Sequence, residues 1–153
     1  MKESFLFLYN FIRYPFATGA VLPSSRRLAA RMVDGSGIDA AKTVVELGPG
    51  TGVFTRAISE HIGSETVYMG IELREKFAAL VSEKFPDLCI VNDSAENIVE
   101  NLTKLGRTEA DTIISGLPWA AFDTDLQKRI MASVTEALAP GGKFATFTYL
   151  HAV

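Results

Sequence analysis

The chain of 153 residues has the length of one domain, and its composition, 48% hydrophobic and 22% charged, is typical of a globular protein with an apolar core. Its single cysteine, Cys89, excludes an intramolecular disulfide and a cysteine-only metal site, and we expect a buried structural thiol. No apolar run reaches the roughly 18 residues that span a bilayer, and Arg13 interrupts the apolar N-terminal stretch, so we expect neither a membrane span nor a signal peptide, and a cytoplasmic location.

The net charge of −3 is unevenly distributed along the chain. Residues 1–33 carry a net +4, whereas the remaining residues carry −7. A basic, aromatic-rich head on an acidic body favours an anionic partner for the head.

The first part of the chain, residues 1–39, forms an apolar and basic leader. Phe5, Leu8, Phe11 and Ile12 fall at helical spacing and predict a helix that ends at Pro15, and a second helix is expected from about residue 24. The apolar residues of the first helix could pack on the rest of the protein or lie on a membrane, and the spacing alone leaves both interpretations open.

From residue 40 onward, short β-rich runs alternate with helical patterns. We predict strands at about 43–48, 67–72, 88–92, 111–115 and 143–150, and helices at about 52–62, 74–84, 95–104 and 123–138. Pro140-Gly141-Gly142 is expected to stop the last helix and turn the chain. The alternation indicates βαβ units and a parallel sheet, so we expect a single α/β domain over residues 1–153.

A glycine-rich turn follows the first predicted strand. The motif consists of Glu46, Gly48, Pro49, Gly50, Thr51 and Gly52. Glycines allow a sharp turn and let a ligand lie against bare main chain. The spacing E-x-G-x-G-x-G departs from the dinucleotide fingerprint and lacks a P-loop lysine, which disfavours NAD and ATP.

Acidic residues end the next two strands. Glu72, followed by Leu73, closes the second strand 20 residues after Gly52, where a carboxylate can accept hydrogen bonds from ribose hydroxyls. Asp93, Ser94 and Ala95 follow the third strand, where a carboxylate can accept from an adenine amino group while the next N–H donates to the ring. Asp93 or Ser94 can equally cap the following helix, and the two roles are compatible.

A fourth turn follows the fourth strand. It consists of Ser115, Gly116, Leu117, Pro118 and Trp119. Such a turn offers carbonyls and a flat apolar wall that could orient an amine nitrogen, partly by cation–π contact. The alternative is that Trp119 only packs in the core. All four motifs come at the carboxyl ends of predicted parallel strands, where ligands bind in open α/β sheets.

On these motifs the chain resembles class I S-adenosylmethionine-dependent methyltransferases over roughly residues 40–150, and within that class it is most similar to bacterial phospholipid N-methyltransferases. The leader segment 14–26, the glycine turn 46–52 and Ser115-Gly116-Leu117-Pro118 carry the resemblance. It implies a Rossmann-like sheet of order 3-2-1-4-5 with a helical leader that caps the substrate site. The class usually has seven strands, so we expect the strand 6/7 hairpin to be absent from this chain. Strand five is then an exposed edge through which copies could associate.

The resemblance also implies roles for the motifs. The glycine turn would surround the methionine part of S-adenosylmethionine, Glu72 would hold the ribose, and Asp93 with its two successors would hold the adenine. Ser115 to Trp119 would form the floor where the acceptor amine meets the methyl group, with S-adenosylhomocysteine as product. Residues 1–31 would contact anionic lipid at the inner membrane face and lead an ethanolamine headgroup inward.

The expected reaction is therefore N-methylation of phosphatidylethanolamine or its methylated forms. Tyr149, at the end of strand five, is a candidate catalytic residue, and no metal site is expected. One alternative is an rRNA adenine N6-methyltransferase, which is disfavoured because the fourth motif lacks Asn-Leu-Pro-Tyr and the body is acidic. The other alternative is a truncated, non-catalytic module that binds the cofactor or a partner.

Overall fold

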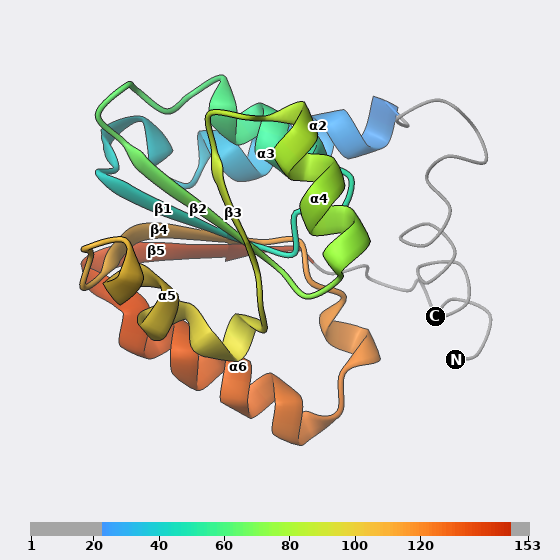
Figure 1. The fold of residues 1–153 in the computed structure, drawn as a ribbon, viewed down its shortest axis with the longest axis vertical. Coiled ribbons are helices and arrows are strands. Elements are labelled where there is room, and N and C mark those ends of the chain that lie inside the picture. The colour runs from blue at the N-terminus through green and yellow to red at the C-terminus, as the bar shows by residue number, and fades with distance from the viewer. Residues whose placement is uncertain (1–22, 148–153) are drawn as a thin grey trace.

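The computed structural model describes residues 23–147, which contain one sheet of five parallel strands (Figure 1). The strands are β1 (Thr43–Leu47), β2 (Val67–Glu72), β3 (Cys89–Asn92), β4 (Ala110–Ser115) and β5 (Leu138–Thr146). Their order is β3-β2-β1-β4-β5. The predicted α/β class and strand order are therefore confirmed.

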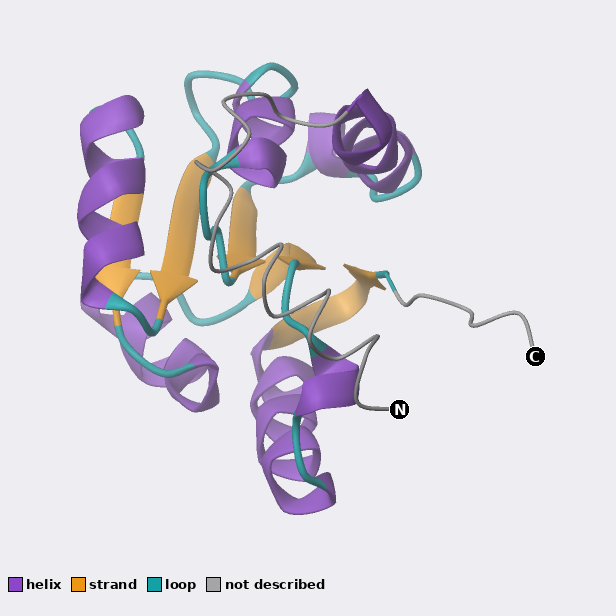
Figure 2. Cartoon of the chain, turned by 90° about the vertical axis from the view of Figure 1, so that its right-hand side faces the viewer, coloured by secondary structure: helices purple, strands orange, loops and turns teal. Residues whose placement is uncertain are grey.

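Helices cover both faces of this sheet (Figures 1 and 2). On one face lie α2 (Pro23–Asp34), α3 (Val53–Ser59) and α4 (Glu75–Lys84), and on the other lie α5 (Ile98–Lys104) and α6 (Thr124–Ala137). Short 3-10 turns occur at Ile38–Ala40, Ala95–Asn97 and Trp119–Ala121. All five residues of the central strand β1 are buried, as expected for a parallel strand that is covered on both faces.

Alternation along β1 divides its side chains between two cores. Val45 and Leu47 pack with α5 and α6, whereas Val44 packs with α2 and α3. Glu46 lies two residues after Val44 and bonds to Thr55 of α3, so it occupies the α2–α3 side of the sheet. A carboxylate therefore lies in a layer that is otherwise mostly apolar.

Several predicted boundaries differ from the structure. Strand β5 begins at Leu138, directly after α6, rather than at about residue 143. Pro140-Gly141-Gly142 forms an irregularity inside the strand: the pairing jumps from Ala110↔Leu138 to Thr112↔Lys143, and Gly141 has a φ of 77°. A bulge absorbs the extra residues without ending the strand. The predicted helix 52–62 is shorter, and residues 95–104 divide into a 3-10 turn and α5.

Parts of the predictions lie outside the described residues. They include the first leader helix, Tyr149 and the end of the predicted fifth strand. Helix α2 begins at Pro23, next to its predicted start. No helix within residues 23–147 is long and apolar enough to cross a membrane.

Candidate functional site

The glycine turn connects β1 to α3 at the carboxyl edge of the sheet. Gly48, Gly50 and Gly52 all have positive φ, at 69°, 58° and 91°. A Cβ on Gly48 would lie 2.8 Å from Cδ2 of Leu117, because the turn after β4 packs directly against the glycine turn. A Cβ on Gly50 would meet nothing closer than 3.9 Å, so its backbone conformation, rather than packing, requires glycine there.

Glu72 joins the tip of β2 to the glycine turn. Its carboxylate accepts a hydrogen bond from Gly50 N at 3.0 Å through Oε2 and one from Arg74 N at 3.0 Å through Oε1. A carboxylate has about four acceptor positions, so about two remain for a ligand. The next residue, Leu73, has 71% of its surface exposed, an unusual position for a large apolar side chain. Glu72 and Leu73 thus place open acceptors beside an exposed apolar surface.

Glu46 is completely buried beneath the same turn. Its Oε2 accepts hydrogen bonds from Oγ1 of Thr55 at 2.8 Å and from the Tyr68 hydroxyl at 2.5 Å. Its Oε1 has no partner within the described part of the chain. Burial raises the pKa of Glu46 from 4.5 to about 7, against the lowering effect of the two hydrogen bonds, and the charge of Glu72 raises it further.

In contrast, most acceptor positions of the Asp93 carboxylate are filled by neighbouring residues. Its Oδ1 accepts from Ser94 N at 2.7 Å and from Nδ2 of Asn97 at 2.9 Å, and its Oδ2 accepts from Nδ2 of Asn101 at 2.7 Å. The hydrogen bonds from Asn101, Asn97 and Ser94 N lower the pKa of Asp93. Ser94 caps the 3-10 turn by accepting from Glu96 N at 3.2 Å, so the predicted capping role is confirmed for Ser94.

The turn after β4 lies against the glycine turn. Gly116 N donates to the carbonyl of Leu47 at 2.8 Å, and a Cβ on Gly116 would lie 3.1 Å from the Gly48 carbonyl oxygen. Ser115 is fully buried, and its Oγ accepts from Leu117 N and from Nε1 of Trp119. The first and fourth motifs therefore meet, as predicted, at one edge of the sheet.

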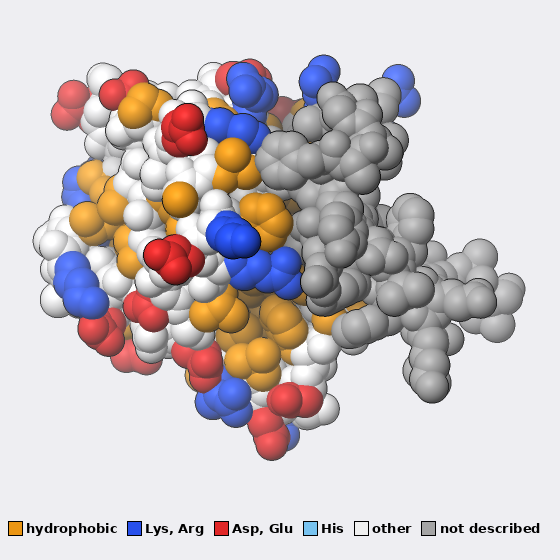
Figure 3. Space-filling view, turned by 45° about the vertical axis from the view of Figure 1, so that its right-hand side comes forward, with side chains coloured by type: hydrophobic (Ala, Val, Ile, Leu, Met, Phe, Trp, Pro, Cys, Tyr) orange, Lys and Arg blue, Asp and Glu red, His pale blue; other side chains and the backbone are white. Residues whose placement is uncertain are grey.

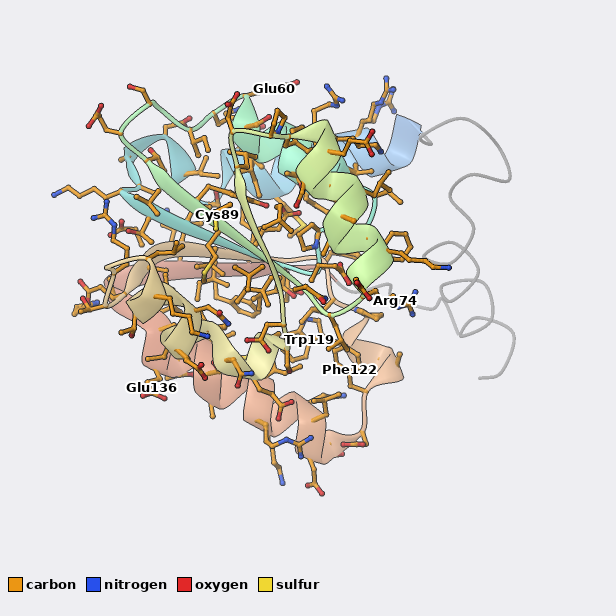
Figure 4. All side chains as sticks on the ribbon, in the orientation of Figure 1. Glu60, Arg74, Cys89, Trp119, Phe122 and Glu136 are labelled. Carbon is orange, nitrogen blue, oxygen red and sulfur yellow. The ribbon has the colours of Figure 1, made fainter. Side chains whose placement is uncertain are left out.

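Trp119 lies on this turn within an aromatic cluster (Figure 4). Its ring makes edge-to-face contacts with Phe122 at 6.1 Å and with Phe144 at 6.2 Å. Gln127 of α6 donates from Nε2 to the carbonyls of Trp119 and Phe122, both at 3.0 Å. Trp119 also packs against the apolar core, as the alternative interpretation of this residue expected.

Sequence reasoning missed several residues that contact the motifs, which include Asn97, Asn101 and Gln127 and three residues beside the glycine turn. Tyr68 and Thr55 bond to Glu46, and Phe54 lies with Cδ2 3.7 Å from where a Cβ of Gly116 would be. Two-residue alternation along β2 places Tyr68 on the same face as Gly70 and Glu72, which is a signal that could have identified it.

Solved structures share this fold. DesVI from Streptomyces venezuelae matches with a TM-score of 0.69 at 19% identity, over 87% of this chain and 54% of its own. CalS10, an amino pentose methyltransferase from Micromonospora echinaspora solved with S-adenosylmethionine bound, matches with a TM-score of 0.71 at 18% identity, over 90% and 56%. The O-methyltransferase from Bacillus cereus, in complex with S-adenosylhomocysteine, matches with a TM-score of 0.63 at 15% identity, over 83% and 57%. The chain spans a little over half the length of these three structures.

The family is established by sequence. The family model described as a methyltransferase domain matches residues 44–142. The chain belongs to the class I S-adenosylmethionine-dependent methyltransferases, and S-adenosylmethionine is its cofactor. It is 32% identical over 151 residues to an ornithine lipid N-methyltransferase from Singulisphaera acidiphila. The match covers 97% of this chain and 79% of that protein.

The carboxyl edge of the sheet fits this cofactor. The buried Oε1 of Glu46 needs a donor, Glu72 keeps open acceptor positions, and the glycine turn leaves bare backbone beside Gly50. A cofactor with an ammonium group, ribose hydroxyls and a flat base supplies the complementary groups.

Proposed function

We propose that this methyltransferase methylates the amine of a membrane lipid headgroup, with phosphatidylethanolamine or its methylated forms as acceptor. The observation that carries this proposal is the 32% identity to a lipid N-methyltransferase over 97% of the chain. That similarity extends beyond the methyltransferase domain at residues 44–142, mostly into the N-terminal leader.

The name of the same relative supports ornithine lipid as a second acceptor. Ornithine and ethanolamine both present an amine that must be uncharged when it attacks a methyl group. The two acceptors differ in the group that links the amine to the lipid, so a direct comparison of the two lipids separates them.

Within the cofactor site we propose that Glu46 and the glycine turn surround the methionine part, and that Glu72 holds the ribose. The turn that begins at Asp93 would hold the adenine, with one acceptor position of its carboxylate still open. When bound, S-adenosylmethionine supplies a methyl group that its sulfonium makes electrophilic. The protein then mainly aligns the acceptor, a contribution worth several kcal/mol in such reactions.

For the acceptor we propose the turn of Ser115 to Trp119. Ser115 fixes the Trp119 ring through the indole N–H, and Gln127 fixes the turn from α6. A rigid aromatic wall beside the glycine turn suits an amine that gains methyl groups, since cation–π attraction persists after the nitrogen becomes quaternary.

We further propose that the protein binds the membrane surface through basic side chains of α2. Arg26 and Arg27, near the start of this helix, and Arg31, in its last turn, are exposed. On the face of the molecule that Figure 3 shows, basic and hydrophobic side chains lie beside one another. Each basic side chain near a bilayer that contains anionic lipid contributes about 1 kcal/mol of binding free energy.

The membrane proposal is tested by flotation with vesicles. Binding should be stronger to vesicles that contain anionic lipid than to neutral vesicles, and reversing charge at Arg26 and Arg27 should reduce it at least threefold. Reversal at Lys104 and Lys128, on α5 and α6, is the matched control and should change little. Equal binding to neutral vesicles, or equal losses in both double variants, would refute this role of α2.

The reaction is tested by following methyl transfer from labelled S-adenosylmethionine into vesicles. Vesicles of phosphatidylethanolamine and of ornithine lipid are the two substrates, and vesicles of phosphatidylcholine, whose nitrogen has no proton to exchange for a methyl group, are the control. Label in either substrate above the control supports lipid N-methylation and identifies the acceptor. Label only in added RNA, or cofactor binding without transfer to any of these, would overturn the proposal.

A further inference from the structure

The hydrogen bonds to Glu46 are shared unevenly between its two carboxylate oxygens. Both donors that reach this carboxylate, Thr55 from α3 and Tyr68 from β2, bind the same oxygen, Oε2. The other oxygen is buried and has no partner. Two donors on one oxygen fix the orientation of the carboxylate, and the unpaired oxygen then needs a proton or a donor from a ligand.

The β1–β2 pairing explains how the Tyr68 hydroxyl reaches Glu46. Glu46 pairs with Gly70, and Tyr68 lies two residues before Gly70 on the same face. A Cβ on Gly70 would lie 2.7 Å from the Tyr68 hydroxyl oxygen. The missing side chain at Gly70 therefore makes the space through which the phenol crosses to Glu46.

Few charged groups act on Glu46 and Tyr68. Tyr68 and Thr55 face Glu46 directly, and Glu72 is the other acidic group that acts on it. No basic side chain in the described part of the chain forms an ion pair with Glu46. Burial, and then the charge of Glu46, raise the pKa of Tyr68, so the phenol keeps its proton and remains a donor.

We propose that Tyr68 is a positioning residue that, with Thr55, holds Glu46 so that its free oxygen receives the ammonium group of the cofactor, and that binding of the cofactor displaces a proton from Glu46. This inference rests on the proposed role of Glu46 in the cofactor site. Without cofactor, a proton on Glu46 removes the buried charge near neutral pH. With cofactor, the ammonium group takes the place of that proton, and the proton leaves to solvent.

The direction of the pH dependence follows from this exchange. The proton and the ammonium group compete for the same carboxylate, so cofactor affinity falls as the pH decreases below about 7, the pKa of Glu46. Removing the Tyr68 hydroxyl removes a hydrogen bond that stabilises the charged form. It therefore raises the pKa of Glu46 and moves the loss of affinity to higher pH.

The experiment measures S-adenosylhomocysteine binding by calorimetry from pH 5.5 to 8.5, in buffers of low and of high ionisation enthalpy to count released protons. The wild-type chain should lose affinity approaching tenfold per pH unit at the acid end and release up to one proton on binding. Tyr68→Phe should shift this curve to higher pH, by at least threefold in affinity at pH 7, and Glu46→Gln should remove the pH dependence.

Two further variants separate positioning from general damage to the fold. Thr55→Val should shift the curve in the same direction but less. The hydrogen bond from Thr55 lowers the pKa of Glu46 less than the hydrogen bond from Tyr68 does. Thr103→Val makes the same change where the hydroxyl bonds only to a carbonyl within α5, so it should leave the curve unchanged.

The outcomes are distinguishable. If Tyr68→Phe weakens binding equally at every pH, or if the wild-type chain binds without proton release, the proposal fails while the cofactor site stands. A water molecule that satisfies the free oxygen of Glu46 would give that second result. If the folded wild-type chain binds no S-adenosylhomocysteine at any pH, both the inference and the proposed cofactor site fail.

Discussion

The glycine turn and the β3–α5 turn (residues 93–97) both lie beside carboxylates at the carboxyl edge of the sheet, but these carboxylates differ in burial and in hydrogen bonding. Within the described residues around the glycine turn, one oxygen of Glu46 is unpaired and the carboxylate of Glu72 accepts two hydrogen bonds. In the β3–α5 turn, Asp93 accepts three hydrogen bonds from its own neighbours. Burial raises the pKa of Glu46 despite its two hydrogen bonds, whereas hydrogen bonds from Asn101, Asn97 and Ser94 N lower the pKa of the less buried Asp93.

From this difference we expect that acceptor positions left open, rather than the presence of an acid, mark where the cofactor binds. A carboxylate whose oxygens are already occupied holds its own turn together. A carboxylate with a free, buried oxygen costs stability until something donates to it. The glycine turn should therefore respond strongly to cofactor, whereas the β3–α5 turn should respond mainly through the stability of the fold.

The largest expected effect is on the pH dependence of stability without cofactor. The unfolded chain ionises Glu46 near pH 4.5, whereas the folded chain keeps the proton to about pH 7. Between these values the wild-type protein should lose on the order of 3 kcal/mol of unfolding free energy relative to Glu46→Gln, and little more above them. Urea unfolding across this range measures the difference.

The control for that measurement is Glu60→Gln, an exposed residue after α3. It should show no such divergence from the wild-type protein. A constant difference between the wild-type protein and Glu46→Gln over the whole range would mean that Glu46 is not held protonated in the folded state.

The next effect is on cofactor affinity at Glu72. Glu72→Ala removes both the open acceptor positions and the hydrogen bond to Gly50 N, so S-adenosylhomocysteine should bind at least tenfold more weakly. Calorimetric titration at constant pH measures it. Glu75→Ala, which removes the same charge from an exposed position in the first turn of α4, should bind within about twofold of wild type. Unchanged affinity in Glu72→Ala would remove the ribose assignment.

The smallest effect on affinity is expected at Asp93. Asp93→Asn loses charge-assisted hydrogen bonds to Asn97 and Asn101 and should destabilise the fold by about 1 kcal/mol at neutral pH. Because the folded pKa is lowered from 3.8, this stabilisation is present above that pH and is lost as the pH falls through the folded value. Affinity for S-adenosylhomocysteine should fall only about threefold.

Thermal unfolding with and without S-adenosylhomocysteine measures both the stability of Asp93→Asn and its affinity for this ligand. The control is Asp87→Asn, in the exposed turn before β3. An affinity loss larger than that of Glu72→Ala would reverse the comparison between the two turns.

The sequence predicts much of this arrangement because its signals are local. Runs rich in Val and Ile mark β1 and β4, and glycines at alternate positions mark the turn before α3. Parallel strands bring their carboxyl ends to one edge, so the meeting of the glycine turn with Gly116 followed from topology alone.

The remaining features depend on tertiary contacts. The partners of Asp93 lie one and two helical turns further along, and only the orientation of α5 turns Asn101 towards it. The Tyr68–Glu46 bond depends on the β1–β2 register and on the space at Gly70. The early start of β5 could not be predicted, because Pro140-Gly141-Gly142 indicates a turn and only the pairing with β4 converts it to a bulge.

Whether the cofactor binds at the glycine turn is measured by following backbone amide resonances by NMR while S-adenosylhomocysteine is added to the wild-type chain. We expect the largest shifts at Gly48, Gly50, Gly52 and Leu73, and smaller shifts at Asn97 and Asn101. Shifts that are absent, or that are largest in α5 and small in the glycine turn, would contradict this expectation.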